Sequence, residues 1–233
     1  MSDRERYWKV LNGDGSACRG GSGKWPLPHD GKPGEWIEVK GELVPCQNGL
    51  HLCRRQDLLG WLGPAIYEVE YDGERVDAGD KIVVRRARLL RRVETWTERS
   101  AREFAADCAE AALLGELAEG RETDKRLWEA VEAARAYARG EIGAEVLAAA
   151  GAAAGDAALA AAGDAAGDAA AGDAAAGDAA AGAAAAGAAA WDAAWAAAWD
   201  AAWAAAAWAA ARAAAGDAMT DCLFWILYPE EGR

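Results

Sequence analysis

Residues 188–218 read AAAWDAAWAAAWDAAWAAAAWAAARAAAGDA, an alanine stretch interrupted at regular intervals by tryptophan. Trp191, Trp195, Trp199 and Trp203 are four residues apart, and Trp208 follows five residues later. Because alanine has the highest helix propensity of all residues, this composition predicts a helix over residues 188–215. Each four-residue step advances the side chain by about 40° around a helix, so the indole rings should form one slanted ridge.

The tryptophan ridge needs a covering surface, because adjacent indole rings are too apolar to remain in water together. One candidate surface is the Ala/Gly-rich remainder of the same helical bundle. The other is a protein partner or a second copy of the chain. We therefore expect the tryptophans at 191, 195, 199, 203 and 208 to pack within the bundle or to bind a partner.

Residues 151–187 carry a glycine, or Leu159, every four or five residues, with a strict five-residue period over the last part. A five-residue step advances about 140° on a helix and makes no stripe, and each interior glycine costs about 1 kcal/mol relative to alanine. Three interpretations remain: helices whose backbones approach closely, a short-turn solenoid, or a flexible linker. The helix is favoured because a solenoid needs a bulky inward residue in each turn.

The composition excludes several classes of function. The chain has 233 residues and a formal net charge of −13, which disfavours unaided binding to nucleic acid or to an anionic membrane. Its first residues are charged and show no secretory signal. Asp192, Asp200 and Arg212 interrupt the apolar tail, so we expect no membrane-spanning helix. Five cysteines without a framework spacing favour a reduced, cytoplasmic location.

Residues 1–96 have the pattern of a small α+β domain. Strands are predicted at residues 7–11, 36–39, 50–53, 65–71 and 81–90, with a short helix at 56–62. Asp72 and Gly73 predict a hairpin-type turn. The last strand carries the basic cluster of the chain, at Arg85, Arg86, Arg88, Arg91 and Arg92.

Helices dominate after residue 96. Thr97 is a plausible N-cap for a helix to about Leu117, and Thr123 or Asp124 caps a second one with Leu127, Val131, Ala134 and Ala138 on one face. Residues 97–146 thus form a two-helix connector. Residues 147–233 form an Ala/Gly/Trp-rich helical tail, a repeat or a bundle, onto which the apolar segment 222–228 should dock. The expected fold class is α+β.

Three cysteines and a histidine are candidates for a zinc site in the first domain. Cys18, Cys46, His51 and Cys53 offer thiolates and an imidazole, and residues 51 and 53 share a face of a strand. The set contains no C-x-x-C pair, so buried or idle thiols are the simpler interpretation. Zinc is thus an alternative, and no cofactor is expected.

An enzymatic alternative rests on a resemblance. Gly49–Leu52, a short helix and the strand 65–71 are similar in order to ADP-ribosyltransferase-like folds, in which such a strand lines a nicotinamide pocket and a later glutamate acts at the ribose. The resemblance implies NAD as cofactor, Glu68 or Glu70 as the catalytic carboxylate, and His51 in the pocket. It also implies that the loop with Arg19 and His29 covers the ligand. The simpler interpretation is a surface glutamate and a structural histidine.

Two further resemblances cover most of the chain. The segments YWKVLN (7–12), CRG (18–20), CQNGLHLC (46–53) and IYEVE (66–70) resemble a small uncharacterised domain of phage and bacterial proteins, which is commonly followed by Gly/Ala-rich repeats. Residues 104–142 and the Ala-rich tail resemble actinobacterial proteins described as immunity proteins. Neither resemblance implies an activity. We expect a non-enzymatic interaction or accessory protein, phage- or prophage-borne or of immunity type, that binds a protein partner or self-associates.

Overall fold

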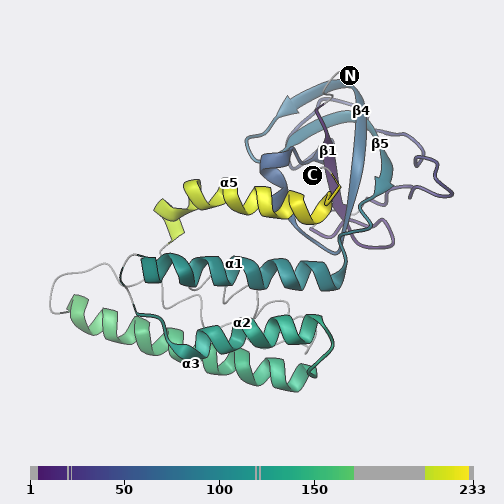
Figure 1. Ribbon diagram of the computed structural model, residues 1–233. Helices are drawn as coiled ribbons and strands as arrows, with labels where there is room; N and C mark the ends of the chain where they lie inside the picture. Colours follow the sequence, from purple (N-terminus) through teal and green to yellow (C-terminus); the bar gives the residue numbers. More distant parts are fainter. Residues whose placement is uncertain are drawn as a thin grey trace. The chain divides into compact units, whose positions relative to one another are not determined.

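The computed structural model of the chain describes residues 5–19, 21, 23–118, 120, 122–170 and 208–230 (Figure 1). These residues divide into two compact units. The first comprises Met1–Thr97 together with Gly216–Arg233, and the second comprises Glu98–Ala215. The expected α+β class is confirmed, because an antiparallel sheet is followed by helices.

The first unit is built on an antiparallel sheet in which β4 and β5 are the long central strands. The strands are β1 (Tyr7–Leu11), β2 (Ile37–Glu38), β3 (Leu50–Leu52), β4 (Ala65–Asp77) and β5 (Ile82–Arg92). Their order is β1-β4-β5-β2, and β3 pairs with the start of β5 on the same edge as β2. The short helix expected after β3 is a 3-10 helix, η1 (Arg55–Trp61).

The alternation of side chains along the strands builds the core of this unit. Tyr7 and Leu11 of β1 and Tyr67 and Val69 of β4 lie in one buried cluster, since residues two apart point to the same side of a sheet. The cluster is completed by Trp25, Leu52, Ala65, Ile82, Val84, Ala87 and Leu89. The predicted strands of β1, β4 and β5 are thereby confirmed, and so is their apolar face.

The predicted hairpin turn at Asp72 and Gly73 is wrong. β4 continues through these residues to Asp77, and its pairing with β5 changes register between Asp72 and Arg75. Gly73 has a φ of 83°, which suits a bulge as well as it suits a turn. The chain reverses instead around Gly79, which has a φ of 80°.

The second unit contains the helices α1 (Glu98–Ala118), α2 (Lys125–Ala138) and α3 (Ala144–Ala170). Asp124 is the N-cap of α2, as expected, and its side chain accepts a hydrogen bond from the backbone N–H of Arg126. The core of the unit consists of Ala106, Leu113, Val131, Ala134 and Leu147. The predicted face of α2 contributes Val131 and Ala134 to this core, and α1 contributes Ala106 and Leu113.

The described part of the tail is helical up to Leu227. Residues 151–170 of α3 are α-helical, so this part of the range 151–187 is not a solenoid. The helix expected over residues 188–215 is described from Trp208, where α5 (Trp208–Leu227) begins. Residues 171–207, with Trp191, Trp195, Trp199 and Trp203, lie outside the described residues.

The end of α5 differs from the expectation that residues 222–228 dock on the helical bundle. From Gly216 on, the chain belongs to the first unit. The Phe224 ring lies 4.9 Å from the Trp8 ring of β1, and the Thr95 hydroxyl donates to the carbonyl of Leu227 (2.7 Å). Figure 1 shows the yellow end of α5 beside β1. The sheet offers this segment an aromatic ring and polar partners for its last helical turn, which a surface of alanine does not.

Replacing Arg135 of α2 with methionine should destabilise the helical unit by about 2 kcal/mol. The substitution leaves the carboxylates of Asp107 and Glu110 on α1 without their positively charged partner. The Arg135 guanidinium contacts Asp107 (2.8 Å) and Glu110 (2.5 Å) of α1, and it holds the pKa of Glu110 below its ordinary value. Urea unfolding of the full chain, followed by far-ultraviolet circular dichroism, measures the change. Arg139→Met is the matched control, since Arg139 contacts the nearby Glu141. Equal midpoints for both variants would contradict the prediction.

Candidate functional site

Ionisable side chains gather around β3, between β1 and the start of β5. We define the β3 cluster as Lys9, Cys18, Cys46, His51, Cys53 and Lys81. Lys9 of β1 donates a hydrogen bond from Nζ to the backbone carbonyl of His51 (3.0 Å). Cys53 follows β3 and exchanges two backbone hydrogen bonds with Trp8 (2.9 and 2.8 Å), which ties the cluster to β1. The structure thus brings the motif around Cys46–Cys53 next to the first strand.

The imidazole of His51 serves as a hydrogen-bond acceptor. Its Nε2 accepts from the backbone N–H of Cys46 at 3.0 Å, so the neutral ring carries its proton on Nδ1. Burial lowers the pKa of His51, and the positive charges of Lys9 and Lys81 lower it further. His51 is therefore neutral at physiological pH and holds the turn around Cys46, whose φ is 65°.

The cysteines of the cluster differ in exposure. Burial raises the pKa of Cys53 to about 12, which keeps it a thiol at neutral pH. Cys18 is partly exposed and Cys46 is exposed. Within the described part of the chain, no three His, Cys, Asp or Glu side chains form a group that could hold a metal ion. The proposed zinc ligands Cys18, Cys46, His51 and Cys53 are thus not assembled into a coordination shell.

The Trp61 ring packs beside the β3 cluster, between two cationic side chains. The Lys81 ammonium lies 4.6 Å from the centre of the Trp61 ring and 3.1 Å from the Asp80 carboxylate. The Arg19 guanidinium lies 5.7 Å from the same ring and donates to the carbonyl of Leu62 (2.9 Å). These contacts fix η1 against the loop of Arg19 and the β4–β5 turn.

The two candidate catalytic glutamates lie elsewhere on the sheet and are paired with arginines. The buried carboxylate of Glu68 accepts from Arg91 Nη2 (2.7 Å) and Nε (2.9 Å). Glu70 pairs with Arg88. Glu68 is the cross-strand partner of Trp8, whereas Lys9 is the partner of Tyr67, so Glu68 and Lys9 point to opposite faces. The printed contacts of Glu68 and Glu70 are with arginines of β5, and that of the His51 ring is with the backbone N–H of Cys46, so none of them joins a glutamate to His51.

The end of α5 lies near Glu68. The Tyr228 hydroxyl accepts a hydrogen bond from the Trp8 indole N–H (2.7 Å), and the nearby Glu68 carboxylate contributes to raising the pKa of Tyr228. Burial raises the pKa of Tyr228, so the hydroxyl stays protonated and can donate. This network gives the Glu68 carboxylate a structural role that the sequence pattern did not indicate.

The basic cluster of β5 is matched by acids of β4. Four cross-strand pairs form a ladder along the two strands: Arg85 with Glu74, Arg86 with Asp72, Arg88 with Glu70, and Arg91 with Glu68. Arg86 and Arg88 also lie over the Trp36 ring, at 4.5 and 4.7 Å from its centre. Because each of these four arginines is paired with an acid, they do not form an unpaired basic surface of the kind that binds the phosphates of nucleic acid.

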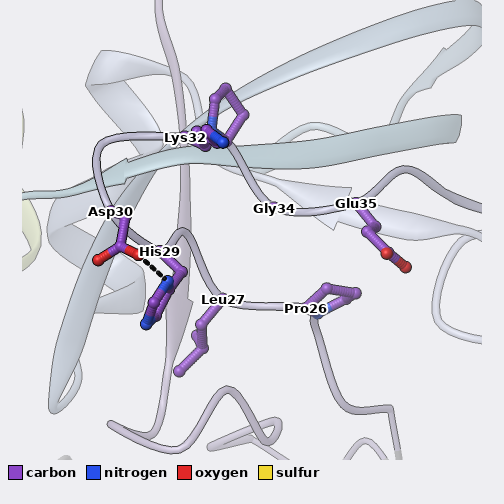
Figure 2. Close-up of a pocket in the computed structure, with 8 residues that line it drawn as sticks. Pro26, Leu27, His29, Asp30, Lys32, Gly34 and Glu35 are labelled. Atoms are coloured by element: carbon purple, nitrogen blue, oxygen red, sulfur yellow. Dashed lines mark ion pairs between the residues drawn. The ribbon is translucent and has the colours of Figure 1, made fainter.

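A surface pocket of about 380 Å³ lies in the Gly/Pro-rich loop before β2, lined by Pro26, Leu27, His29, Asp30, Lys32, Pro33, Gly34 and Glu35 (Figure 2). Figure 2 shows His29 and Asp30 joined by an ion pair, with Nδ1 and Oδ2 2.9 Å apart. Both side chains are highly exposed, at 85% and 79%. Solvent competes for these groups, so the pocket has little to bind a ligand tightly.

The tryptophans predicted to bind a partner remain untested by this geometry. Trp191, Trp195, Trp199 and Trp203 lie outside the described residues, and Trp208 is the first residue of α5.

Sequence reasoning did not single out Lys9 or Lys81 as site residues. A lysine at the centre of the apolar strand YWKVL was the available signal for Lys9.

Comparison with known proteins finds one similarity, which lies in the first unit. Residues 6–100 match the family model of a domain of unknown function, DUF7666. The DUF7666 match spans η1 and the five described strands of the sheet. The predicted similarity to an uncharacterised small domain is confirmed for these residues. It excludes the end of α5, although that segment packs on the domain. No curated protein and no solved structure matches the chain.

No helix in the described part of the chain has both the length and the apolar character that crossing a bilayer requires.

Proposed function

We propose that this chain is a non-enzymatic interaction protein that binds a protein partner, or a second copy of itself, through the tryptophans at 191–208. The proposal includes an accessory or immunity-type role, borne by a phage or prophage, in the cytoplasm. One observation carries it: the side chains that the enzymatic alternative would use are engaged in structural contacts.

The carboxylates are the clearest case. Glu68 accepts two hydrogen bonds from Arg91, and Glu70 pairs with Arg88. A carboxylate that acts at a ribose must be able to approach its substrate, and a bidentate arginine pair occupies both oxygens. This geometry supports binding over NAD-dependent transfer.

The charge pattern supports a protein as the partner. The overall charge of −13 repels nucleic acid, and four arginines of β5 are paired with acids of β4. Tryptophan is typical of protein interfaces, where a few buried aromatic rings carry most of the binding energy, and the segment 191–208 is rich in it.

Removal of the tryptophans at 191–203 tests the proposal. In the full chain, Trp191, Trp195, Trp199 and Trp203 are replaced together by alanine, which keeps helix propensity high. Sedimentation velocity and capture from host lysate are then compared with the unchanged chain. We expect self-association or capture of a defined partner to be lost. Trp225→Ala, which removes an exposed tryptophan of α5, is the control and should change neither result.

Two outcomes would contradict the proposal. The first is retention of self-association and capture in the quadruple variant. The second is NAD consumption by the purified chain that Glu68→Gln or Glu70→Gln abolishes while the circular dichroism spectrum stays unchanged. The second outcome would establish the enzymatic alternative.

A further inference from the structure

Asp30 and Gly31 form the bend of a two-residue turn in the Gly/Pro-rich loop before β2. On either side of the bend, His29 and Lys32 exchange backbone hydrogen bonds of 3.1 and 2.9 Å. The φ angles of Asp30 and Gly31 are 50° and 70°, the positive values that a type I′ turn takes at both central positions. Figure 2 shows the Asp30 side chain on this bend, beside the His29 ring. The turn therefore presents an Asp-Gly peptide bond at the surface of the first unit.

An Asp-Gly peptide bond can rearrange without an enzyme. The backbone nitrogen of the glycine can attack the side-chain carboxyl carbon of the aspartate, and glycine has no Cβ atom to hinder this approach. The chain contains three Asp-Gly pairs, at residues 14–15, 30–31 and 72–73. The reacting groups are the same in all three pairs, so the fold decides which of them is able to react.

The first pair, Asp14 and Gly15, is held by hydrogen bonds on both reacting groups. The Asp14 carboxylate accepts from the backbone N–H (3.0 Å) and the hydroxyl (2.6 Å) of Ser16. These bonds lower the pKa of Asp14 to about 2, which depletes the protonated carboxyl that releases water most readily. The Gly15 N–H, which carries the attacking nitrogen, donates to the carbonyl of Asn12 (3.0 Å). Asp14 is therefore protected in the folded chain.

The third pair, Asp72 and Gly73, lies inside a paired strand. Asp72 of β4 is the cross-strand partner of Arg86 of β5, and its carboxylate lies 3.4 Å from the Arg86 guanidinium. The attack requires the backbone of the aspartate to rotate toward its own side chain. In β4 this rotation breaks the pairing with β5, so the strand must open before Asp72 reacts.

The second pair is under neither constraint. The Asp30 side chain is 79% exposed, and its ion-pair partner His29 is 85% exposed, so water competes for both groups. Rotation of the Asp30 backbone disturbs the His29–Lys32 bridge of one surface turn and no strand of the sheet. Opening a turn of this kind costs far less free energy than opening a central strand.

We propose that the fold leaves Asp30 as the site of spontaneous isoaspartate formation. The Gly31 nitrogen adds to Cγ of Asp30, and the carboxyl hydroxyl leaves with the amide proton as one water, which gives a succinimide ring. Water then adds to the former main-chain carbonyl of Asp30 and opens the ring. The product carries its main chain through the side chain of residue 30 and has a free α-carboxylate. One water is lost and one is gained, so the reaction needs no oxidant or reductant.

The product lengthens the main chain of the turn by one methylene group. This turn lines the pocket of Figure 2, so the modification changes the shape of that loop. The site lies in the first unit and goes beyond the proposed partner binding, which rests on the tail.

Ageing of the full chain tests the proposal. The protein is incubated at neutral pH and physiological temperature for several weeks. Isoaspartate is counted with an isoaspartate methyltransferase and located by peptide mass analysis with electron-transfer fragmentation. Asp14 and Asp72 are the internal controls, because each also precedes a glycine. We expect isoaspartate to accumulate at Asp30 at least about tenfold faster than at either control, because the contacts of the controls must open first.

Two results would overturn the proposal. One is accumulation at Asp30 no faster than at Asp14 and Asp72. The other is a preference for Asp30 that persists in urea, where the contacts of all three sites are lost and their rates should converge. Asp30→Glu should suppress isomerisation at this position, because glutamate would have to close a six-membered ring, and should leave the rates at Asp14 and Asp72 unchanged. The three sites are compared within the unchanged chain, so the test does not depend on how this variant folds.

Discussion

Replacing Gly49 with alanine is expected to destabilise the first unit by about 3–5 kcal/mol, enough to unfold most molecules of a marginally stable domain. A Cβ atom added at Gly49 would lie 2.2 Å from Cγ1 of Val83, a fully buried residue of β5. The φ of Gly49 is 140°, a conformation that side-chain-bearing residues rarely adopt. Overlap and backbone strain therefore act together at the turn that leads into β3.

Urea unfolding of the full chain, followed by far-ultraviolet circular dichroism and by hydrogen exchange of the β5 amides, measures this change. Gly41→Ala is the matched control in the same loop region. Gly41 also has a positive φ, of 84°, but its nearest neighbour would be the Asn48 side chain at 3.6 Å. The control should therefore cost about 1 kcal/mol from strain alone. If both variants lose the same stability, the contact with Val83 does not constrain the turn.

Replacing Phe224 with alanine should cost the first unit about 3–5 kcal/mol, the usual loss for a buried phenylalanine. The Phe224 ring is 5% exposed and meets the Trp8 ring edge to face, with an interplanar angle of 81°. It stacks on Tyr228, and the Arg55 guanidinium lies 3.9 Å from its centre. Its loss would leave Trp8 uncovered and loosen the network of Tyr228 and Glu68.

Hydrogen exchange of the β1 amides, Tyr7 to Leu11, reports this effect directly, because β1 carries Trp8. The adjacent Trp225→Ala is the control, since that side chain is 62% exposed and its removal should change protection little. Unchanged β1 protection in the Phe224 variant would show that the domain is stable without the end of α5. The DUF7666 segment of residues 6–100 would then be the complete folding unit.

The elements were predictable where the signal is local. Alternation of apolar residues placed β1 and the first half of β4, and the 3.6-residue period placed α1 and α2, because the buried face of each element repeats along the chain. The N-cap of α2 at Asp124 was also readable, since a carboxylate at that position satisfies a free backbone N–H.

Local signals were insufficient where one sequence serves two geometries. Asp72 and Gly73 have the residue types of a tight turn, but the same positive φ at glycine accommodates the irregularity inside β4. The apolar character of residues 222–228 predicted that this segment packs on another part of the chain. It could not predict which part, because an apolar face packs on any complementary surface. Glu68 and Glu70 suggested chemistry from their place on a strand, whereas their arginine partners come from β5.

By itself the sequence determined the kinds of element, their approximate ends, the acidic charge and the helical character of the described tail, because these follow from neighbouring residues. Only the tertiary structure decided which distant residues share a site. Lys9 meets the carbonyl of His51 across 42 positions, and Trp8 meets Tyr228 across 220. Such pairs depend on strand order and register, which are selected by burial of the whole core and leave no periodic trace in the chain.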